Sequence, residues 1–189
     1  MEAKIFSIDR QKVDLTELEL SGPTLDIGGG GEGIIGQIKK EELLVIDKRE
    51  DELQEAPSGG IKMIMDAKDM GFLNNSFAGA TSFFTLMYIP AEEHPGVFSE
   101  IYRVLKPGGH FWVWDVKMPK RGNREENVFV VPLLVELGEK TVETGYGVLW
   151  DKEQNLEYFL ELGEKTGFQI VEKRETGETF FLKLRKRKE

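Results

Sequence analysis

A glycine-rich segment that begins with a carboxylate carries the clearest chemical signal in this sequence. Residues 26–33 read Asp-Ile-Gly-Gly-Gly-Gly-Glu-Gly and complete the short apolar run Pro23–Ile27. Glycines permit a sharp turn with positive φ and let a ligand approach the bare backbone. If a helix follows the turn, its first amides are free to donate hydrogen bonds. The segment therefore predicts a ligand-binding turn between a buried strand and a helix.

Two classes of ligand are compatible with this turn. The spacing Gly28-x-Gly30-x-x-Gly33 matches the dinucleotide fingerprint, and Asp47 lies at about the 20-residue distance expected for a ribose contact. Asp26 argues against a dinucleotide, because its charge would face the pyrophosphate, whereas an ammonium or sulfonium group would be attracted. Asp26 could also simply bind the amides of its own loop. An NAD(P)-binding oxidoreductase therefore stays as an alternative.

Three carboxylates are predicted to meet at one edge of a sheet. Asp26, Asp47 and Asp66 stand at the ends of three successive apolar runs, 23–27, 43–47 and 61–66. The carboxyl ends of parallel strands lie at the same edge. With no histidine or further acid at ligand spacing nearby, the three carboxylates suit a metal ion poorly. They suit hydrogen bonds to the amine and hydroxyl groups of one organic ligand.

The elements that must position these residues alternate between short β-type runs and helical patterns, which is typical of a parallel sheet flanked by helices. We expect further strands at 79–84 and 111–116, and helices after Gly33, up to Glu55, at 95–105 and at 151–166. The last two β-type runs, 168–174 and 179–184, are separated by four residues. Because so short a connection allows only an antiparallel hairpin, the sheet should contain one antiparallel strand.

Five motifs occur in order along the chain: Leu25–Gly30, Val45–Asp47, Met65–Asp69, Asn75–Phe77 and Tyr102–Gly109. Together they resemble the class I S-adenosylmethionine-dependent methyltransferases, roughly from residue 20 to residue 116 and in outline at the C-terminal end. The resemblance implies an α/β, Rossmann-like three-layer sandwich. Its seven-stranded sheet would be mostly parallel with one antiparallel strand, and its cofactor would be S-adenosyl-L-methionine.

The resemblance also implies roles for single residues. Asp26 would lie near the methionine part of the cofactor, Asp47 would bind the ribose hydroxyls, and Lys48 would lie against adenine. Asp66 would meet the adenine amine, and Phe83 would approach the sulfonium side. The implied cofactor-binding set is Asp26, Gly28, Gly29, Gly30, Gly33, Asp47, Lys48, Asp66, Ala67 and Phe83.

Two positions depart from the family pattern. The turn from Gly30 to Gly33 is one residue longer than in the commonest form of the motif, which leaves open which late glycine touches the ligand. Ala78 also stands where many members carry Asp.

We predict one methyltransferase-like domain in residues 1–189, with a cofactor-binding core at 22–116, an insert at 117–150 and a helix plus hairpin at 151–189. Two stretches of the insert, 127–134 and 141–149, are β-like and flank a plausible turn at 138–140. The insert leaves the carboxyl end of a central strand, where open α/β sheets bind ligands. It should therefore cover the acceptor site, although a surface hairpin without a role is an equal alternative.

Candidate catalytic residues are expected at the same edge of the sheet, where the strands have their carboxyl ends. Methyl transfer needs alignment of the reacting groups more than a dedicated base. Tyr88, His94 and Asp115 each leave the carboxyl side of a central strand and are the candidates. His94 could instead be a solvated residue at a helix start. Tyr146 and Trp150 could wall an acceptor pocket.

The composition restricts the class of methyl acceptor and the expected location of the protein. The chain has no cysteine, so a thiolate nucleophile is excluded. A net charge of −9 disfavours nucleic acid, and the absence of an apolar run of about 18 residues predicts no membrane span. We expect a cytoplasmic monomer or homodimer that acts on a small molecule. A non-catalytic cofactor-binding or scaffold protein is the other alternative.

Overall fold

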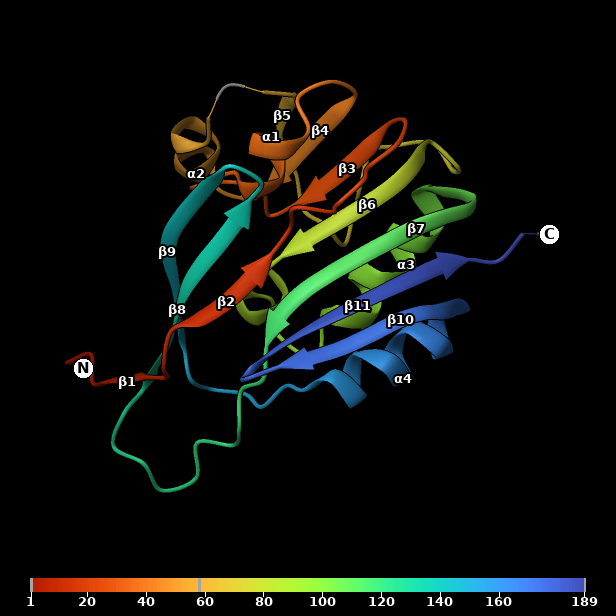
Figure 1. Cartoon of the computed structure of the whole chain (residues 1–189). Helices are drawn as coiled ribbons and strands as arrows, with labels where there is room; N and C mark the ends of the chain where they lie inside the picture. The colour runs from red at the N-terminus through yellow and green to blue at the C-terminus, as the bar shows by residue number, and fades with distance from the viewer. Residues whose placement is uncertain (1, 58, 189) are drawn as a thin grey trace.

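The computed structural model describes residues 2–57 and 59–188, which form two β-sheets and the helices beside them (Figure 1). The larger sheet contains β3 (Thr24–Ile27), β4 (Leu43–Asp47), β5 (Ile61–Ile64), β6 (Phe77–Phe83), β7 (Leu105–Val116), β10 (Phe168–Thr176) and β11 (Thr179–Lys186). Its order is β10-β11-β7-β6-β3-β4-β5, and β11 runs antiparallel to both of its neighbours. The predicted seven-stranded sheet with one antiparallel strand is confirmed.

The chain changes direction across this sheet at β3. From β3 it runs outward through β4 to β5, and it then returns to the other side of β3 as β6. The strands end in step, because Ile27 pairs with Ile46 of β4 and with Ser82 of β6. A crevice at such a switch point is where open α/β sheets bind ligands.

Two long helices cover one face of the sheet. α3 (His94–Val104) and α4 (Leu156–Thr166) pack there, and the Phe98 ring on α3 lies 5.5 Å from Phe111 and 6.1 Å from Phe159. α4 starts later than predicted, because Asn155 accepts a hydrogen bond from the Tyr158 amide and caps the helix there. The short α1 (Ile34–Ile38), α2 (Glu50–Glu55) and 3-10 helix η1 (Leu86–Tyr88) follow β3, β4 and β6.

A second sheet occupies the opposite face. It consists of β8 (Val128–Leu137) and β9 (Lys140–Leu149), which form an antiparallel hairpin, and of β1 (Ile5–Ser7) and β2 (Gln11–Asp14), which pair in parallel with β8. The hairpin confirms the predicted β-like stretches, whereas β1 and β2 were not predicted. Phe129 and Val131 of β8 are buried in one core with Trp114 of β7. The insert therefore forms part of the hydrophobic core of the protein.

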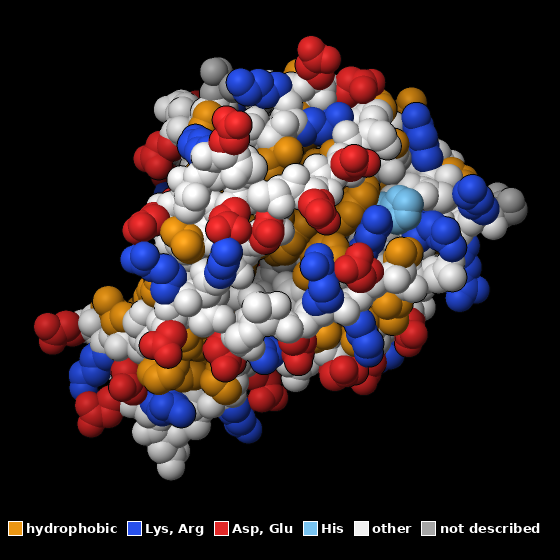
Figure 2. Space-filling model, in the orientation of Figure 1, with side chains coloured by type: hydrophobic (Ala, Val, Ile, Leu, Met, Phe, Trp, Pro, Cys, Tyr) orange, Lys and Arg blue, Asp and Glu red, His pale blue; other side chains and the backbone are white. Residues whose placement is uncertain are grey.

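The molecular surface has no single sign of charge on the face drawn in Figure 2. Lys and Arg side chains are interspersed there with Asp and Glu, and apolar side chains show in a band near the centre and in a second patch at the lower left. Among the described residues, no helix combines the length and apolarity needed to cross a membrane.

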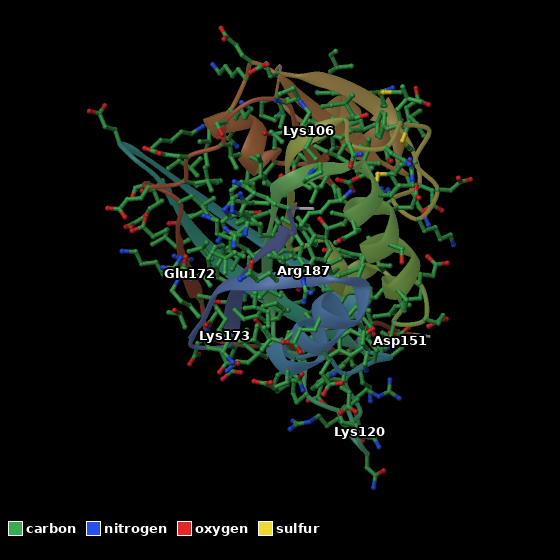
Figure 3. The ribbon with its side chains drawn as sticks, turned by 90° about the vertical axis from the view of Figure 1, so that its right-hand side faces the viewer. Lys106, Lys120, Asp151, Glu172, Lys173 and Arg187 are labelled. Carbon is green, nitrogen blue, oxygen red and sulfur yellow. The ribbon has the colours of Figure 1, made fainter. Side chains whose placement is uncertain are left out.

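The sheet edge formed by β10 is strongly charged. Figure 3 labels Glu172 and Lys173 on this strand, and both are exposed. Charged side chains on an edge strand disfavour pairing with another chain. Lys120, on the loop between β7 and β8, lies at the opposite end of this view from Lys106.

Several strand boundaries differ from those predicted, and three of these differences concern the strands near the crevice. β5 ends at Ile64, so Asp66 lies in the following loop, although the Met65 amide still donates to the Asp47 carbonyl at 2.9 Å. β6 ends at Phe83, because Phe84 takes a left-handed conformation with φ of 51°. β7 begins at Leu105, directly after α3, and contains the segment that was expected to separate them.

Candidate functional site

A cavity of about 800 Å³ opens at the carboxyl ends of β3, β4, β5 and β6. The glycine-rich loop, α2, η1, β9 and the start of α3 with the loop before it supply the rest of its wall. We call the part at β4 and β5 the outer end; it contains Asp47, Lys48, Asp66, Ala67 and Glu93. The inner end lies at β3, β6 and β9 and contains Glu32, Phe83, Phe84, Tyr88 and Tyr146.

The glycine-rich loop is shaped by close approach to its neighbours. Gly28 has φ of +68°, and a Cβ there would lie 2.2 Å from the Thr85 methyl group. At Gly30 a Cβ would lie 2.5 Å from Glu52 Cβ and 3.0 Å from Asp47 Oδ2. The Gly31 amide donates to the Glu52 carbonyl at 2.8 Å, which ties the loop to α2. The loop thus presents bare backbone to the cavity beside the Asp47 carboxylate.

Three residues of the implied set lie behind this loop, away from the cavity lining. The Asp26 side chain is buried and accepts a hydrogen bond from Thr81 Oγ1 at 2.7 Å. Burial raises the pKa of Asp26 to about 7, against the lowering effect of that hydrogen bond. Gly29 packs on the Asp26 carboxylate, and Gly33 packs on Pro57. Of the late glycines, Gly30 and Gly31 face the cavity and Gly33 does not.

The outer end holds a network of four charges. Lys48 Nζ lies 3.0 Å from Asp66 Oδ2 and 3.7 Å from Glu93 Oε2, and Lys68 pairs with the same two acids. The Lys68 amide also donates to Asp66 Oδ1 at 3.0 Å. Burial would raise the pKa of Asp66, but these hydrogen bonds and the lysine charges outweigh it and hold the pKa below its usual value. Asp66 is therefore an ionised acceptor at neutral pH.

Asp47 is fixed next to this network. Its Oδ1 accepts a hydrogen bond from the Arg49 amide at 2.9 Å, while Oδ2 lies toward Gly30. One carboxylate oxygen thus orients the side chain, and the other faces the cavity. This arrangement suits an acceptor of hydroxyl hydrogen bonds.

The inner end is aromatic. The Tyr146 ring stacks on Phe84, with centroids 5.6 Å apart, and stands edge-on to Phe83 at 6.4 Å. Phe84 is a bulky residue with a positive φ, an unfavourable conformation that marks functional sites in many proteins. Tyr88 is 47% exposed, and burial raises its pKa to about 12 against a hydrogen bond from the Gly147 amide. Both tyrosine hydroxyls are consequently protonated at neutral pH, since the pKa of Tyr146 is raised as well.

His94 and Asp115, predicted as catalytic candidates, do not line the cavity. His94 is fully buried, which corrects the alternative of a solvated position, and its Nε2 donates to the Leu86 carbonyl at 3.0 Å. Burial and the Lys152 charge lower the pKa of His94 to about 4, although the hydrogen bond to Leu86 opposes this. Its Nδ1 lies 3.1 Å from the Tyr158 hydroxyl.

Asp115 is equally enclosed. It accepts hydrogen bonds from the Met87 amide at 3.2 Å, from the Val116 amide at 2.8 Å and from Gln154 Nε2 at 2.8 Å. Burial raises the pKa of Asp115 to about 6, against these hydrogen bonds. Lys152 Nζ donates to the Leu86 and Ile89 carbonyls. His94, Asp115 and Lys152 therefore hold η1 in place, and of the three catalytic candidates only Tyr88, on η1 itself, reaches the cavity.

Two residues of the inner end had a weak sequence signal or none. Glu32 belongs to the glycine-rich segment but was not singled out, and Tyr146 was named only as a possible pocket wall. The hairpin brings them together, because Thr144 Oγ1 on β9 donates to Glu32 Oε1. Trp150, the other named wall residue, is buried, and its Nε1 donates to the Pro119 carbonyl at 2.7 Å.

Comparison with known proteins agrees with this geometry. Residues 25–113 match a family model described as a methyltransferase domain. The chain is 42% identical over 59 residues to sterol 24-C-methyltransferase erg-4 of Neurospora crassa, which is 31% of this chain and 15% of that protein. It is 27% identical over 184 residues to 24-methylenesterol C-methyltransferase 2 of Arabidopsis thaliana, at 88% and 47% coverage. The chain thus spans less than half the length of these curated relatives.

Solved structures share the fold. A methyltransferase from Methanosarcina mazei superposes with a TM-score of 0.62 at 18% identity, over 88% of this chain and 92% of that one. A protein from Pyrococcus horikoshii OT3 gives 0.67 at 18% identity, over 92% and 85%. The cyclase SpnF gives 0.66 at 16% identity, over 92% and 77%.

The strand order, the glycine-rich loop after β3 and the acids that end β4 and follow β5 define a Rossmann-like, cofactor-binding fold. With the match over residues 25–113, they make the chain similar to the class I S-adenosylmethionine-dependent methyltransferases. S-adenosylmethionine is the cofactor of this class. The residues present fit it, because Gly28, Gly30 and Gly31 line the cavity without side chains, and Asp47 and Asp66 offer carboxylate acceptors.

Proposed function

We propose that this protein transfers a methyl group from S-adenosylmethionine to a small molecule held at the inner end of the cavity. The observation that carries the proposal is the continuity of the cavity. One space of about 800 Å³ joins a polar outer end, suited to adenosine, with an aromatic inner end covered by β9. Both curated relatives are named as sterol methyltransferases, which supports a small-molecule acceptor.

In this proposal the outer end binds the adenosine part. Asp47 Oδ2 accepts hydrogen bonds from the ribose hydroxyls, and Asp66 accepts one from the adenine amine next to Ala67. Lys48 keeps Asp66 ionised and packs its stem against the base. The backbone of Gly28, Gly30 and Gly31 lines the methionine part, and Asp26 behind the loop adds to the negative potential there.

When bound, the cofactor supplies an activated methyl group on its sulfonium. The chain supplies alignment, since Phe83 and Phe84 fix one wall and Tyr88 and Tyr146 another. β9 and η1 limit water at the inner end. The two hydroxyls, with raised pKa values, donate hydrogen bonds and do not act as bases. Glu32 is the carboxylate at this end that can accept a proton.

The cofactor site is tested by the variant Asp47→Ala. We expect S-adenosylhomocysteine to bind the parent protein in calorimetric titration, NAD not to bind, and the variant to lose about 1.5–3 kcal/mol of binding free energy, the worth of hydrogen bonds to a charged group. Asp69→Ala is the control, because Asp69 is exposed and lies off the cavity. Equal affinity of parent and Asp47→Ala would remove Asp47 from the site, and binding of NAD alone would favour an oxidoreductase.

The likeness to SpnF favours one other candidate, a protein that binds the cofactor without methyl transfer, because SpnF is named as a cyclase and shares the fold. Transfer of labelled methyl groups to metabolite extracts separates the two functions. Labelled product supports the methyltransferase, whereas cofactor binding with no labelled product across such extracts supports the alternative.

A further inference from the structure

The inner end of the cavity has the composition of a site for a cation. Its wall is formed by the rings of Phe83, Phe84, Tyr88 and Tyr146, which come from the end of β6, the residue after it, η1 and β9. The negatively charged face of an aromatic ring attracts ammonium groups within about 6 Å. Beside Tyr146, the neighbouring positions 145 and 147 are glycines that also line the cavity, so β9 leaves room for a ligand there.

A carboxylate is fixed among these rings. Thr144 Oγ1 donates a hydrogen bond to Glu32 Oε1, which holds the Glu32 side chain against β9. Burial raises the pKa of Tyr146, and the negative charge of Glu32 next to it acts in the same direction. Glu32 and the Tyr146 hydroxyl therefore lie close together at the inner end.

The basic residues of the cavity lining lie elsewhere and are neutralised. Among the described residues that line the cavity, the Lys and Arg side chains are those of Lys48 and Arg49, both at the outer end. Lys48 pairs with Asp66 and Glu93, and Arg49 pairs with Asp51 and Glu52. The acids of the lining outnumber them, namely Glu32, Asp47, Glu52, Glu55, Asp66 and Glu93. The potential in the cavity is therefore negative, which attracts cations and repels carboxylate or phosphate groups.

We propose that the acceptor is an amine, held as its ammonium form between the rings of Tyr88 and Tyr146 with Glu32 as counter-ion. This inference rests on the proposed methyl transfer. The ammonium gives a proton to Glu32, and the freed nitrogen lone pair forms a bond to the methyl carbon. The carbon–sulfur bond breaks, its electron pair stays on sulfur, and the product leaves as a methylated ammonium.

The test uses the full chain saturated with S-adenosylhomocysteine, so that no turnover occurs. Three probes of matched shape are phenethylamine, 2-phenylethanol and 3-phenylpropionate, with dissociation constants measured by ligand-observed NMR. We expect the amine to bind at least about tenfold more tightly than the carboxylate, with the alcohol between them. The preference should weaken as salt is added.

Two variants assign this preference to the inner end. Glu32→Gln should weaken amine binding about tenfold while S-adenosylhomocysteine affinity changes by less than about twofold. Tyr146→Leu should also weaken it, whereas Tyr146→Phe, which keeps the ring, should not. Glu139→Gln, at the exposed hairpin turn, carries the same change of charge and is the control. Thermal unfolding confirms that each variant is folded.

Several results would overturn the inference. They are equal binding of the amine and the carboxylate, absence of amine binding at millimolar concentration, and an amine preference that survives in Glu32→Gln. If the alcohol bound best, the acceptor would be uncharged, as the names of the sterol relatives suggest. Failure of the proposed function is distinguished by calorimetry of S-adenosylhomocysteine alone, which does not depend on any acceptor.

Discussion

At the scale of single residues, two carboxylates near the cavity have pKa values that are shifted in opposite directions. Asp66 is kept ionised by Lys48 and Lys68, whereas Asp26 is buried without a cationic partner among the contacts described. A buried, unpaired carboxylate costs free energy when it ionises. We interpret Asp26 as a residue that adds negative potential behind the glycine-rich loop and lowers the stability of the folded state.

The variant Asp26→Asn tests this interpretation. The pKa of Asp26 is raised in the folded state, to about 7, so the folded state binds more protons and stability falls as the pH rises from 3.8 through 7. Asn keeps an acceptor for Thr81 but carries no charge. We expect the variant to exceed the parent in unfolding free energy by on the order of 4 kcal/mol at pH 8, with little difference at pH 3.5.

The measurement is urea denaturation at the two pH values, combined with calorimetric titration of S-adenosylhomocysteine and S-adenosylmethionine. The variant should bind S-adenosylmethionine, which carries the sulfonium, more weakly than the parent does. Its affinity for S-adenosylhomocysteine, an uncharged thioether, should change less. A pH-independent difference in stability would show that Asp26 is not the titrating group.

At the scale of elements, the second sheet serves both the site and the core. β9 contributes Tyr146 and two glycines to the cavity, and β8 buries Phe129, Val131, Leu133 and Val135 beneath it. β1 and β2 complete the sheet, which makes residues 5–7 and 11–14 part of this layer. Removing the insert would expose the core as well as open the cavity, so point variants are the sharper probe.

Phe129→Ala should lower the free energy of unfolding by about 3–5 kcal/mol, since the Phe129 side chain is fully buried against Phe6 and Trp150. Val130→Ala is the matched control, because Val130 lies on the other face of the same strand and is only half-buried. It should cost less than about 1 kcal/mol. Chemical denaturation provides both values, and a similar cost at the two positions would contradict the packing of β8 on the main sheet.

At the scale of the whole molecule, two cores lie on opposite faces of one sheet. α3 and α4 cover one face, and the second sheet with α1 and α2 covers the other. β4, β6, β7 and β11 contribute side chains to both cores, so loss of either core exposes the same strands. We therefore expect a single cooperative unfolding transition.

The three tryptophans make this expectation measurable. Trp112, Trp114 and Trp150 all belong to the core on the side of the second sheet, so their fluorescence reports that core, whereas far-UV circular dichroism reports the whole chain. Denaturation curves from the two probes should coincide. A fluorescence transition that precedes the loss of circular dichroism would show that the second sheet unfolds independently.

The sequence by itself determined the strands of the main sheet and the glycine-rich loop, because the patterns that predict them lie within short stretches of the chain. A four-residue connection permits only a hairpin, and glycines after an acid at the end of an apolar run favour a sharp turn with exposed backbone. The order of the motifs along the chain then predicted which strands have their carboxyl ends at the same edge of the sheet. Asp47, Lys48 and Asp66 accordingly line the cavity as expected, and their contacts with the cofactor stay a prediction.

Only the tertiary structure decided what covers the site and which candidates reach it. β1 and β2 are short and bury little apolar surface of their own, so their pairing depends on β8, more than 100 residues away. Glu32 and Tyr146 lie far apart in sequence and meet because the hairpin folds over the loop. His94 and Asp115 were predicted at the rim from their positions along the chain, but such a position does not say where a side chain points. Their hydrogen bonds to Leu86, Met87 and Gln154 direct them into the core that supports Tyr88.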